Sequence, residues 1–291
     1  MLKIMKKIRP LSLLALILFV GCNNNTIEGM LGDEVVEPQF KWYYSVASSR
    51  TALGDVDENG HRAIYWRDGD CLAINGIVSD PLSGVGEGAR SATFAFYEQP
   101  TPPYSLLYPA SIYKDPETIT LPVRREVSLE TFDAPMAALV DAEGAASLHH
   151  ICAAVRLPLV KDPTNSFSAK YPLKYVKFEG NNKEQISGNF AIDYATQTLT
   201  SLVPPPADGY YNDSRYVRTY IDCTLTDEVS MLVIVVPAVE YTKGFTIKVY
   251  NIKGHYMECV KKTPVTLAPG QIYTLPTTKY SPTSTEFEAG T

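Results

Sequence analysis

The chain has 291 residues, a hydrophobic share of 45% typical of a globular protein, and a formal net charge of −6 at pH 7. Four of the 26 basic residues and none of the 32 acidic ones lie in the first 21 positions, so the remainder carries a charge of about −10. Nucleic acids and anionic lipid surfaces need clustered Lys and Arg, so this balance argues against both as partners.

The first 21 residues have the layout of an export signal. Basic residues precede an uncharged apolar run that is too short to cross a bilayer, since a spanning helix needs about 20 apolar residues. A small residue followed by Cys22 resembles the lipobox of bacterial lipoproteins, although Phe19 stands where that motif usually has Leu. We predict a signal over 1–21, lipid attachment at Cys22 and a tether over 22–37. The alternative is an ordinary signal peptide with an incidental cysteine.

Almost every apolar segment after the tether predicts a β-strand. The runs are short, rich in Val, Ile, Tyr, Phe and Thr, and bounded by Gly, Pro, Asn or Asp. Alternation is clearest where Phe245, Ile247 and Val249 share one face. The predicted strands cover residues 40–46, 63–66, 71–74, 92–97, 104–108, 119–121, 151–160, 175–179, 186–194, 216–225, 231–236, 245–252, 255–261 and 272–275.

The spacing of these strands predicts an all-β fold of antiparallel sandwiches, because no segment is long enough for a helix that crosses between parallel strands. The stretch 134–150 is the one candidate for a helical or irregular connector. We place a domain boundary near its end. This divides the chain into two tandem antiparallel β-sandwich domains over 38–147 and 148–278, each of ordinary domain size, with a short polar tail over 279–291.

Four cysteines follow the predicted lipidation site, each within sequence typical of a strand. Their wide spacing matches no zinc site, while export would permit disulfides. We favour unpaired, buried thiols that pack as small apolar side chains over cystines. The four residues are Cys71, Cys152, Cys223 and Cys259.

The motifs of catalysis and of metal binding do not occur in the sequence. It has no nucleophile elbow, zinc-binding helix motif, phosphate loop or dinucleotide fingerprint. The loop 54–61 imitates a calcium-binding EF loop, but Trp66 stands at position 12, where that loop needs a bidentate Glu. A hairpin turn at Asn59 and Gly60 is favoured instead. We therefore predict no catalytic residue, no cofactor, no metal and no enzymatic activity.

Two polar pairs resemble sites only superficially. His149 and His150 are adjacent on a predicted strand, so their rings point to opposite faces and cannot easily hold one ion. Asp68 and Asp70 have no spacing that marks a general acid and base. With Gly69 between them, they are expected to shape a turn.

Several short motifs occur in order along 40–275. They include an Arg-Thr followed by "YWRDGD", the strand pattern His-X-X-X-Ala-X-Val-X-Leu, and an Ile-Ser-Gly with a following Phe. Each motif alone is weak, but in this order they resemble the fimbrillin family, the fimbrial subunits that Gram-negative anaerobes export as lipoprotein precursors. The likeness covers nearly the whole chain after the tether.

The resemblance implies two transthyretin-like, Greek-key sandwiches and a lipidated precursor carried to the outer membrane. It also implies that an arginine-specific protease removes the N-terminal segment. In that family the lost segment is a strand of the first domain, and a strand of a neighbouring subunit fills the groove it leaves. The implied partners are other fimbrial subunits, and the implied location is the cell surface, within a fimbria.

The stretch 40–50 fits such a removable strand. Its large residues alternate, so one face can lie in a core. The small polar residues that follow suit an accessible loop, with cleavage predicted between Arg50 and Thr51. The alternative is a permanent first strand with Arg50 as a surface residue. The residues on the predicted core-facing side are Phe40, Trp42, Tyr44 and Val46.

The leading interpretation is therefore a structural and adhesive fimbrial subunit, assembled by donor-strand exchange and without catalysis. The segment after Leu275 has too few alternating apolar residues for a donor strand. This favours a tip or accessory subunit over a stalk subunit, with an anchor as the next alternative.

A second interpretation is a free-standing or anchoring outer-membrane lipoprotein that binds a glycan or a host protein. Its candidate ligand loop is 203–216, where three prolines precede Tyr210 and Tyr211. A proline-stiffened connector with tyrosines packed on the sandwich is the favoured explanation of the same loop. A hydrolase would need polar side chains that converge at one end of a sandwich.

Overall fold

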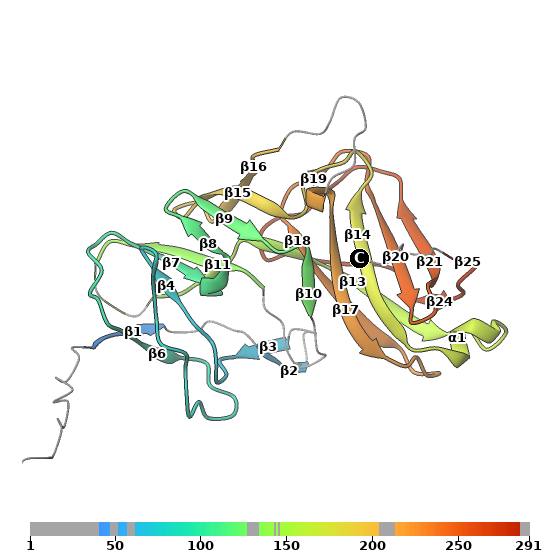
Figure 1. Ribbon diagram of the computed structural model, residues 1–291, viewed down its shortest axis with the longest axis horizontal. Helices are drawn as coiled ribbons and strands as arrows, with labels where there is room; N and C mark the ends of the chain where they lie inside the picture. The colour runs from blue at the N-terminus through green and yellow to red at the C-terminus, as the bar shows by residue number, and fades with distance from the viewer. Residues whose placement is uncertain are drawn as a thin grey trace, which may run out of the picture. The chain divides into compact units, whose positions relative to one another are not determined.

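The chain divides into two units, Met1–Gln39 and Phe40–Thr291, and all described residues belong to the second. Figure 1 shows the strands, drawn as arrows. No helix within the described part is long and apolar enough to span a membrane. The computed structural model describes residues 41–46, 52–56, 62–126, 134–142, 144, 146–203 and 213–285.

The prediction of an all-β fold built from antiparallel sheets is confirmed. The helical elements in the described part are a single short α-helix, α1 (Ser166–Lys170), and two 3-10 turns, η1 (Ala110–Ile112) and η2 (Asp213–Arg215). The predicted strands at 104–108 and 255–261 have the observed bounds of β7 (Tyr104–Tyr108) and β21 (His255–Lys261).

The N-terminal half forms a small sandwich. One layer is β1 (Trp42–Val46) paired with β6 (Ala92–Phe96). The other layer has the order β12 (His149–His150), β11 (Met136–Val140), β7, β4 (Ala73–Ile74) and β5 (Ile77–Val78). Their facing side chains make one buried cluster, which includes Tyr44, Phe94, Leu106 and Met136.

The C-terminal half is a larger sandwich. Its first sheet has the order β10 (Arg124–Glu126), β17 (Tyr216–Cys223), β14 (Leu173–Gly180), β20 (Phe245–Asn251), β21 and β25 (Ser284–Thr285). Its second sheet joins β18 (Ser230–Pro237), β13 (Cys152–Lys161), β23 (Ile272–Thr274) and β24 (Thr278–Tyr280). The core lies between them, and Phe245, Ile247 and Val249 are all within it, which is the face that the alternation predicts.

Three smaller sheets complete the described structure. A four-stranded sheet joins β16 (Thr198–Ser201), β15 (Gly188–Asp193), β9 (Thr118–Leu121) and β8 (Tyr113–Asp115). The hairpin β2 (Ala52–Val56) and β3 (Arg62–Tyr65) brackets the predicted turn, although Asn59 and Gly60 themselves lie outside the described residues. The remaining pair is β19 (Glu240–Tyr241) with β22 (Val265–Thr266).

The expectation of a helical or irregular connector over 134–150 is wrong, because β11 and β12 are strands of the first sandwich. The run around Met136, Ala137 and Ala138 is rich in alanine and has no alternation. All three side chains are at most 4% exposed, and β11 is hydrogen-bonded to β7 and β12. A strand covered on both faces has a continuous apolar sequence, which a short alanine-rich helix shares.

Strand pairs also join residues on the two sides of position 148. β9 pairs with β15, and β10 pairs with β17 in parallel. A third buried cluster combines Leu107 and Ile119 with Ala154 and Phe190. The division of the chain into domains at 148 stays a prediction.

The predicted polar tail over 279–291 begins inside the second sandwich. β24 pairs with β13 in parallel, and Tyr280 is fully buried in the core between the two sheets. Ser281 Oγ hydrogen-bonds to Asp162, and β25 extends the first sheet beside β21. The sequence does not predict this burial, because Tyr280 is a single aromatic residue between prolines and no alternation of apolar residues surrounds it.

Candidate functional site

The candidate site is the slot that β1 occupies in the first sandwich. β1 pairs with β6 along its whole length, with Trp42 opposite Phe96 and Val46 opposite Ala92. On its other edge, the described residues contain one isolated bridge to β1, between Val46 and Ala146. Within the part of the chain that the structure describes, the strand is thus hydrogen-bonded mainly through its edge with β6.

Side chains of β1 alternate between the core and the solvent. Tyr44 is 3% exposed and Val46 is fully buried, whereas Tyr43 is 62% exposed. Trp42 is half-buried against the same core cluster. A strand presents alternate residues to opposite faces, so one aromatic face of β1 fills the sandwich while the other remains in water.

The inner face of β1 belongs to a cluster of aromatic rings. Trp42 lies 5.6 Å from Phe96 and 6.0 Å from Tyr104 between ring centroids. Tyr44 meets Tyr104 edge to face at 5.8 Å. Aromatic pairs in this range add about 0.5–1.5 kcal/mol beyond the burial of their area. These contacts make the inner face the main source of the binding energy of the strand.

The outer face of β1 is held by exposed polar contacts. Lys41 Nζ forms an ion pair with Asp80 Oδ2 at 2.8 Å and lies 4.8 Å from the centre of the Tyr97 ring. The hydrogen bond to Asp80 raises the pKa of Lys41. The hydroxyls of Ser45 and Thr93 lie 3.0 Å apart. Exposed ion pairs contribute little to stability. These contacts therefore help to fix the register of β1 against β6 and add little to the free energy of unfolding.

The "YWRDGD" motif folds into a turn against the same core, as predicted for Asp68, Gly69 and Asp70. Gly69 has a φ of +89°, a conformation that favours glycine. Asp70 is 5% exposed, and its Oδ1 accepts a hydrogen bond of 2.8 Å from the Tyr108 hydroxyl. Its Oδ2 accepts one of 3.0 Å from the Arg67 amide.

Trp66 of the same motif ties this turn to β6. Its ring lies edge-on to Phe94 at 5.1 Å and to Tyr108 at 5.3 Å, and the residue is 2% exposed. In the sequence, the motif is recognised through its resemblance to a motif of the fimbrillin family. The contacts give it a physical role as the inner wall beside the slot.

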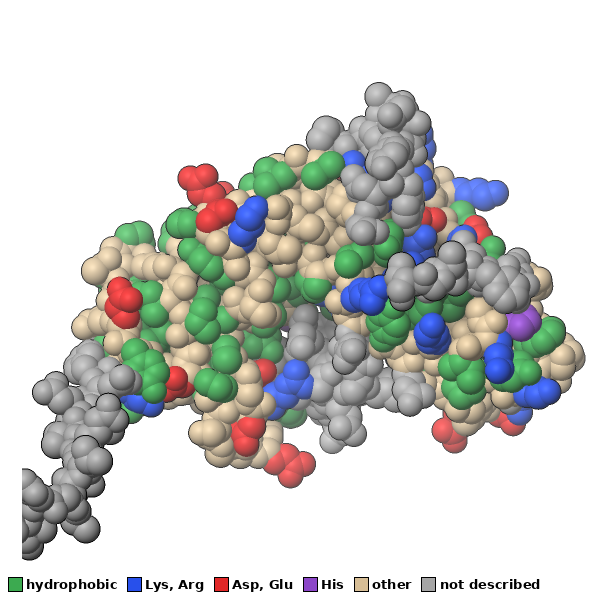
Figure 2. Space-filling view, viewed as in Figure 1, with side chains coloured by type: hydrophobic (Ala, Val, Ile, Leu, Met, Phe, Trp, Pro, Cys, Tyr) green, Lys and Arg blue, Asp and Glu red, His purple; other side chains and the backbone are tan. Residues whose placement is uncertain are grey.

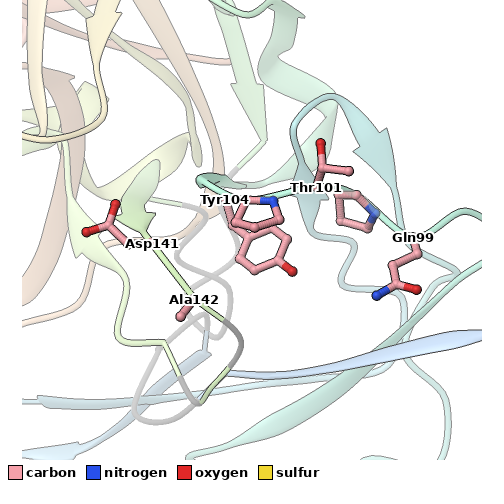
Figure 3. Close-up of a pocket in the computed structure, with 7 residues that line it drawn as sticks. Gln99, Thr101, Tyr104, Asp141 and Ala142 are labelled. Atoms are coloured by element: carbon pink, nitrogen blue, oxygen red, sulfur yellow. The ribbon is translucent and has the colours of Figure 1, made fainter.

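A hollow of about 470 Å³ opens next to the aromatic cluster, shown in Figure 3. It shares Tyr104 with that cluster, and Asp141 is the carboxylate among its described lining residues. The lining is formed by Gln99, Pro100, Thr101, Pro102, Tyr104, Asp141 and Ala142.

The candidate ligand loop is anchored at both ends by two buried polar side chains, although Tyr210 and Tyr211 lie outside the described residues. Gln185, 2% exposed, accepts hydrogen bonds of 3.0 Å on Oε1 from the amides of Leu202 and Val203. Arg215, 1% exposed, donates from Nη1 to the carbonyls of Lys183, at 2.7 Å, and Val203. Burial lowers the pKa of Arg215. No local sequence signal marks either residue as an anchor.

We expect Gln185→Ala to lower the free energy of unfolding by about 2 kcal/mol. The amides of Leu202 and Val203 lose their acceptor, Gln185 Oε1, and the partners near the surface can bond to water instead. The matched control is Gln197→Ala, which removes only local bonds to the carbonyls of Tyr194 and Ala195 and should cost less than about 1 kcal/mol. Urea denaturation measures both. Equal losses would contradict the anchoring role.

The remaining predicted site residues divide into two groups. The predicted lipidation, cleavage and first strand residues Cys22, Arg50, Thr51 and Phe40 lie outside the described residues, and their roles stay predictions. His149 is exposed and His150 half-buried beside a hollow of about 550 Å³ that also includes Thr196 and Gly270. Across the described ranges, no group of three or more His, Cys, Asp or Glu side chains could hold a metal.

The four cysteines are unpaired, in line with the favoured prediction, but one alone is fully buried. Cys152 is buried, while Cys71, Cys223 and Cys259 are half-buried. Burial raises the pKa of Cys152 to about 11, and it also raises those of Cys71 and Cys259. A raised pKa lowers the thiolate fraction of these three side chains at neutral pH.

No protein-family model matches the chain, and no curated protein matches its sequence. Solved structures are similar to it at low identity. One, a "putative cell adhesion protein" from Bacteroides ovatus, is 9% identical with a TM-score of 0.47 over 79% of this chain and 90% of that chain. Another of the same description, from Bacteroides uniformis, is 14% identical with a TM-score of 0.44 over 80% and 94%.

A tip fimbrial protein from Porphyromonas gingivalis, with a C-terminal truncation, is also similar. It is 11% identical with a TM-score of 0.33 over 80% of this chain and 94% of that chain. At these identities and TM-scores, the likeness carries no function from those proteins to this one.

Proposed function

We propose that this chain is a structural and adhesive subunit of a cell-surface fimbria and has no catalytic role. The observation that carries the proposal is the way β1 is held. Among the described residues it is bonded along one edge to β6 and by an isolated bridge to Ala146, while its inner face supplies Trp42, Tyr44 and Val46 to the aromatic core. A strand with these properties can leave as a unit and be replaced as a unit.

The energetics favour replacement over an empty slot. Burial of a large apolar side chain contributes about 1.5–3 kcal/mol, so loss of three would cost roughly 6 kcal/mol. This is comparable with the whole stability of a small domain. Loss of β1 would also leave the amides and carbonyls of β6 without partners, and such an edge accepts a strand from another chain.

The full proposal follows the order of events predicted from the sequence. The precursor is exported, lipidated at Cys22 and carried to the cell outer membrane. An arginine-specific protease then cuts between Arg50 and Thr51, and a strand of another fimbrial subunit enters the slot. The polar sequence between Val46 and Thr51 is suited to such cleavage.

A tip or accessory position is supported by the engagement of the C-terminal segment. Tyr280 is buried in the second core, and β25 is bonded to β21. A segment that completes its own sandwich cannot also be lent to a neighbour without loss of those contacts. The chain is therefore proposed to accept a strand rather than donate one.

A free-standing or anchoring lipoprotein that binds a glycan or a host protein is the second candidate. The observation in its favour is the anchoring of the loop 203–216 by Gln185 and Arg215, since a ligand loop needs a rigid base. In that case β1 would be a permanent strand.

Treatment of the purified chain with an arginine-specific protease tests the proposal. We expect a new N-terminus at Thr51, loss of the segment that contains β1, and formation of oligomers with partner subunits. Arg50→Ala is the control and should stay uncut at this position. A cleaved chain that remains a stable monomer and takes up no strand would contradict the proposal. A mature surface protein whose N-terminus is a lipidated Cys22 would favour the second candidate.

A further inference from the structure

The outer side of β1 and β6 presents two tyrosine rings to solvent. Tyr43 on β1 is 62% exposed, and Tyr97, directly after β6, is 52% exposed. Tyr43 lies opposite Ala95, and Tyr97 comes two positions after Ala95, so both rings stand on one face of the strand pair. Figure 2 shows hydrophobic side chains beside a basic and an acidic one on the surface over these strands. We call this surface, around Tyr43 and Tyr97, the tyrosine face.

A small side chain separates the two rings. Tyr43 and Tyr97 are diagonal neighbours across the strand pair, and such positions lie about 7–8 Å apart. The residue between them on this face is Ala95, which does not project beyond the rings. A flat ligand can therefore lie against Tyr43 without a clash with a bulky neighbour on β6.

One end of the tyrosine face has a hydrogen-bond donor and an acceptor beside each other. The side chains of Lys41 and Asp80, which form an ion pair, are still 36% and 32% exposed. An ammonium has three donors and a carboxylate accepts on two oxygens, so each can bond to a further group. Asp80 is fixed in place, because its amide donates to the Ala95 carbonyl at 2.8 Å.

The other end of the tyrosine face has two hydroxyls. Ser45 and Thr93 are both exposed, and their Oγ and Oγ1 atoms lie 3.0 Å apart. Ser45 is two positions from Tyr43 and shares its face. A hydroxyl can both donate and accept. Tyr43 thus has hydrogen-bonding side chains on both sides along the strand.

We propose that the tyrosine face binds a neutral hexose of a glycan, which stacks on the ring of Tyr43 and bonds through its hydroxyls to Lys41 and Asp80. A hexose has a face of C–H groups and a rim of hydroxyls. The face of an aromatic ring carries partial negative charge and attracts the C–H groups. The hydroxyls need both donors and acceptors, and the ion pair supplies one of each.

The charges on the tyrosine face favour a neutral ligand. The ammonium of Lys41 and the carboxylate of Asp80 neutralise each other at 2.8 Å, and Ser45 and Thr93 are uncharged. An acidic sugar would have to compete with Asp80 for Lys41 and would be repelled by the carboxylate it displaced. A basic ligand would meet the same obstacle at Lys41.

A protein partner fits this surface less well. A stable protein interface buries about 800 Å² on each partner and has an apolar centre with a polar rim. Here the polar side chains stand directly beside Tyr43 and Tyr97, so the two rings form no continuous apolar centre. A second copy of this chain is the alternative occupant, and the experiments below separate it from a sugar.

This inference goes beyond the proposed fibre assembly and does not depend on it. Tyr43 and Ser45 belong to β1, and Lys41 directly precedes it. The tyrosine face is therefore complete only while β1 is in place, whether or not the strand is later replaced. The tests use the uncleaved chain without partner subunits, so failure of strand exchange and failure of sugar binding are distinguishable.

Saturation-transfer difference NMR on the intact chain tests the binding. The probes are the methyl glycosides of β-glucose, β-galactose and α-mannose. With at least one of them, we expect transfer to the C–H protons of one face of the sugar ring. Tyr43→Ala should lower the affinity about tenfold, the scale of losing a stacked ring. Phe167→Ala, at another aromatic residue that is 40% exposed, is the matched control and should leave the affinity unchanged.

Two results of this experiment would overturn the proposal. One is the absence of transfer to all three glycosides. The other is an equal affinity in wild type and in folded Tyr43→Ala, with folding checked by circular dichroism. Tyr43 is exposed, so its replacement is expected to leave the fold intact.

Further variants separate the stacking from the hydrogen bonds. Tyr43→Phe keeps the ring and should keep most of the affinity, whereas Asp80→Ala should weaken it several-fold. The methyl glycoside of N-acetylneuraminic acid should bind more weakly than the best neutral probe, and stronger binding would contradict the preference for a neutral sugar. Analytical ultracentrifugation tests the second copy. A dimer that Tyr43→Ala abolishes would overturn the sugar as the occupant.

Discussion

Replacement of Tyr44 by alanine is expected to lower the free energy of unfolding by about 4 kcal/mol, the scale of an aromatic-to-alanine change in a core. Tyr44 is 3% exposed and packs against Trp42 and Tyr104. The same replacement at Tyr43, one position away and 62% exposed, should change it by less than about 0.5 kcal/mol. The two variants differ only in the face of β1 that they alter.

Urea denaturation followed by tryptophan fluorescence measures both effects. The chain has two tryptophans, Trp42 and Trp66, and both contact the first core, so the signal reports on this sandwich. Similar losses at the two positions would contradict the placement of β1 as a strand with one buried face. A large loss at Tyr44 alone supports the energetic basis of the proposed strand replacement.

The second large effect is expected at Asp70, where alanine should cost about 3 kcal/mol. The change leaves the Tyr108 hydroxyl and the Arg67 amide without the acceptor that they share. A buried donor that loses its acceptor costs about 1–3 kcal/mol. Asp68→Ala is the matched control. Its exposed carboxylate accepts one bond of 2.7 Å from the Val85 amide, and its loss should cost about 1 kcal/mol.

A double-mutant cycle with Tyr108→Phe isolates the bond between the two side chains. We expect Asp70→Ala to cost less in the Tyr108→Phe background, by about 1 kcal/mol or more, because one orphaned donor is already gone. Strictly additive losses would mean that Asp70 acts through its contacts with Arg67 and not through Tyr108. Both sets of measurements use the same denaturation assay as the Tyr44 series.

The alternation of apolar residues predicts most strands of this chain and their buried faces. It succeeds for β1, β20 and β21 because the pleat of a strand is a local property with a fixed period of two. It fails for β11, which is covered on both faces and therefore shows no alternation. It also leaves out β24, where the burial of Tyr280 depends on two sheets that are distant in the sequence.

No local sequence pattern predicts the hydrogen bonds of the buried polar residues Asp70 and Arg215, because their partners are also distant in the sequence. Asp70 bonds to Tyr108, 38 positions away, and Arg215 bonds to Lys183, 32 positions away. Asp68, Gly69 and Asp70 predict a turn, but not that one of the two carboxylates is buried. Which of them enters the core depends on where β7 lies.

The amino-acid sequence of this protein predicts the fold class, the bounds of most strands and the buried face of each. It can do so because backbone sterics and apolar burial act over a few neighbouring positions. Tertiary contacts decide the rest. They pair β1 with β6 along its whole length, bring the rings of Tyr175, Tyr220, Tyr250 and Tyr256 together, and bury Gln185 and Arg215 beside Val203. Each of these depends on register between strands far apart in the chain, and register follows from the packing of whole sheets.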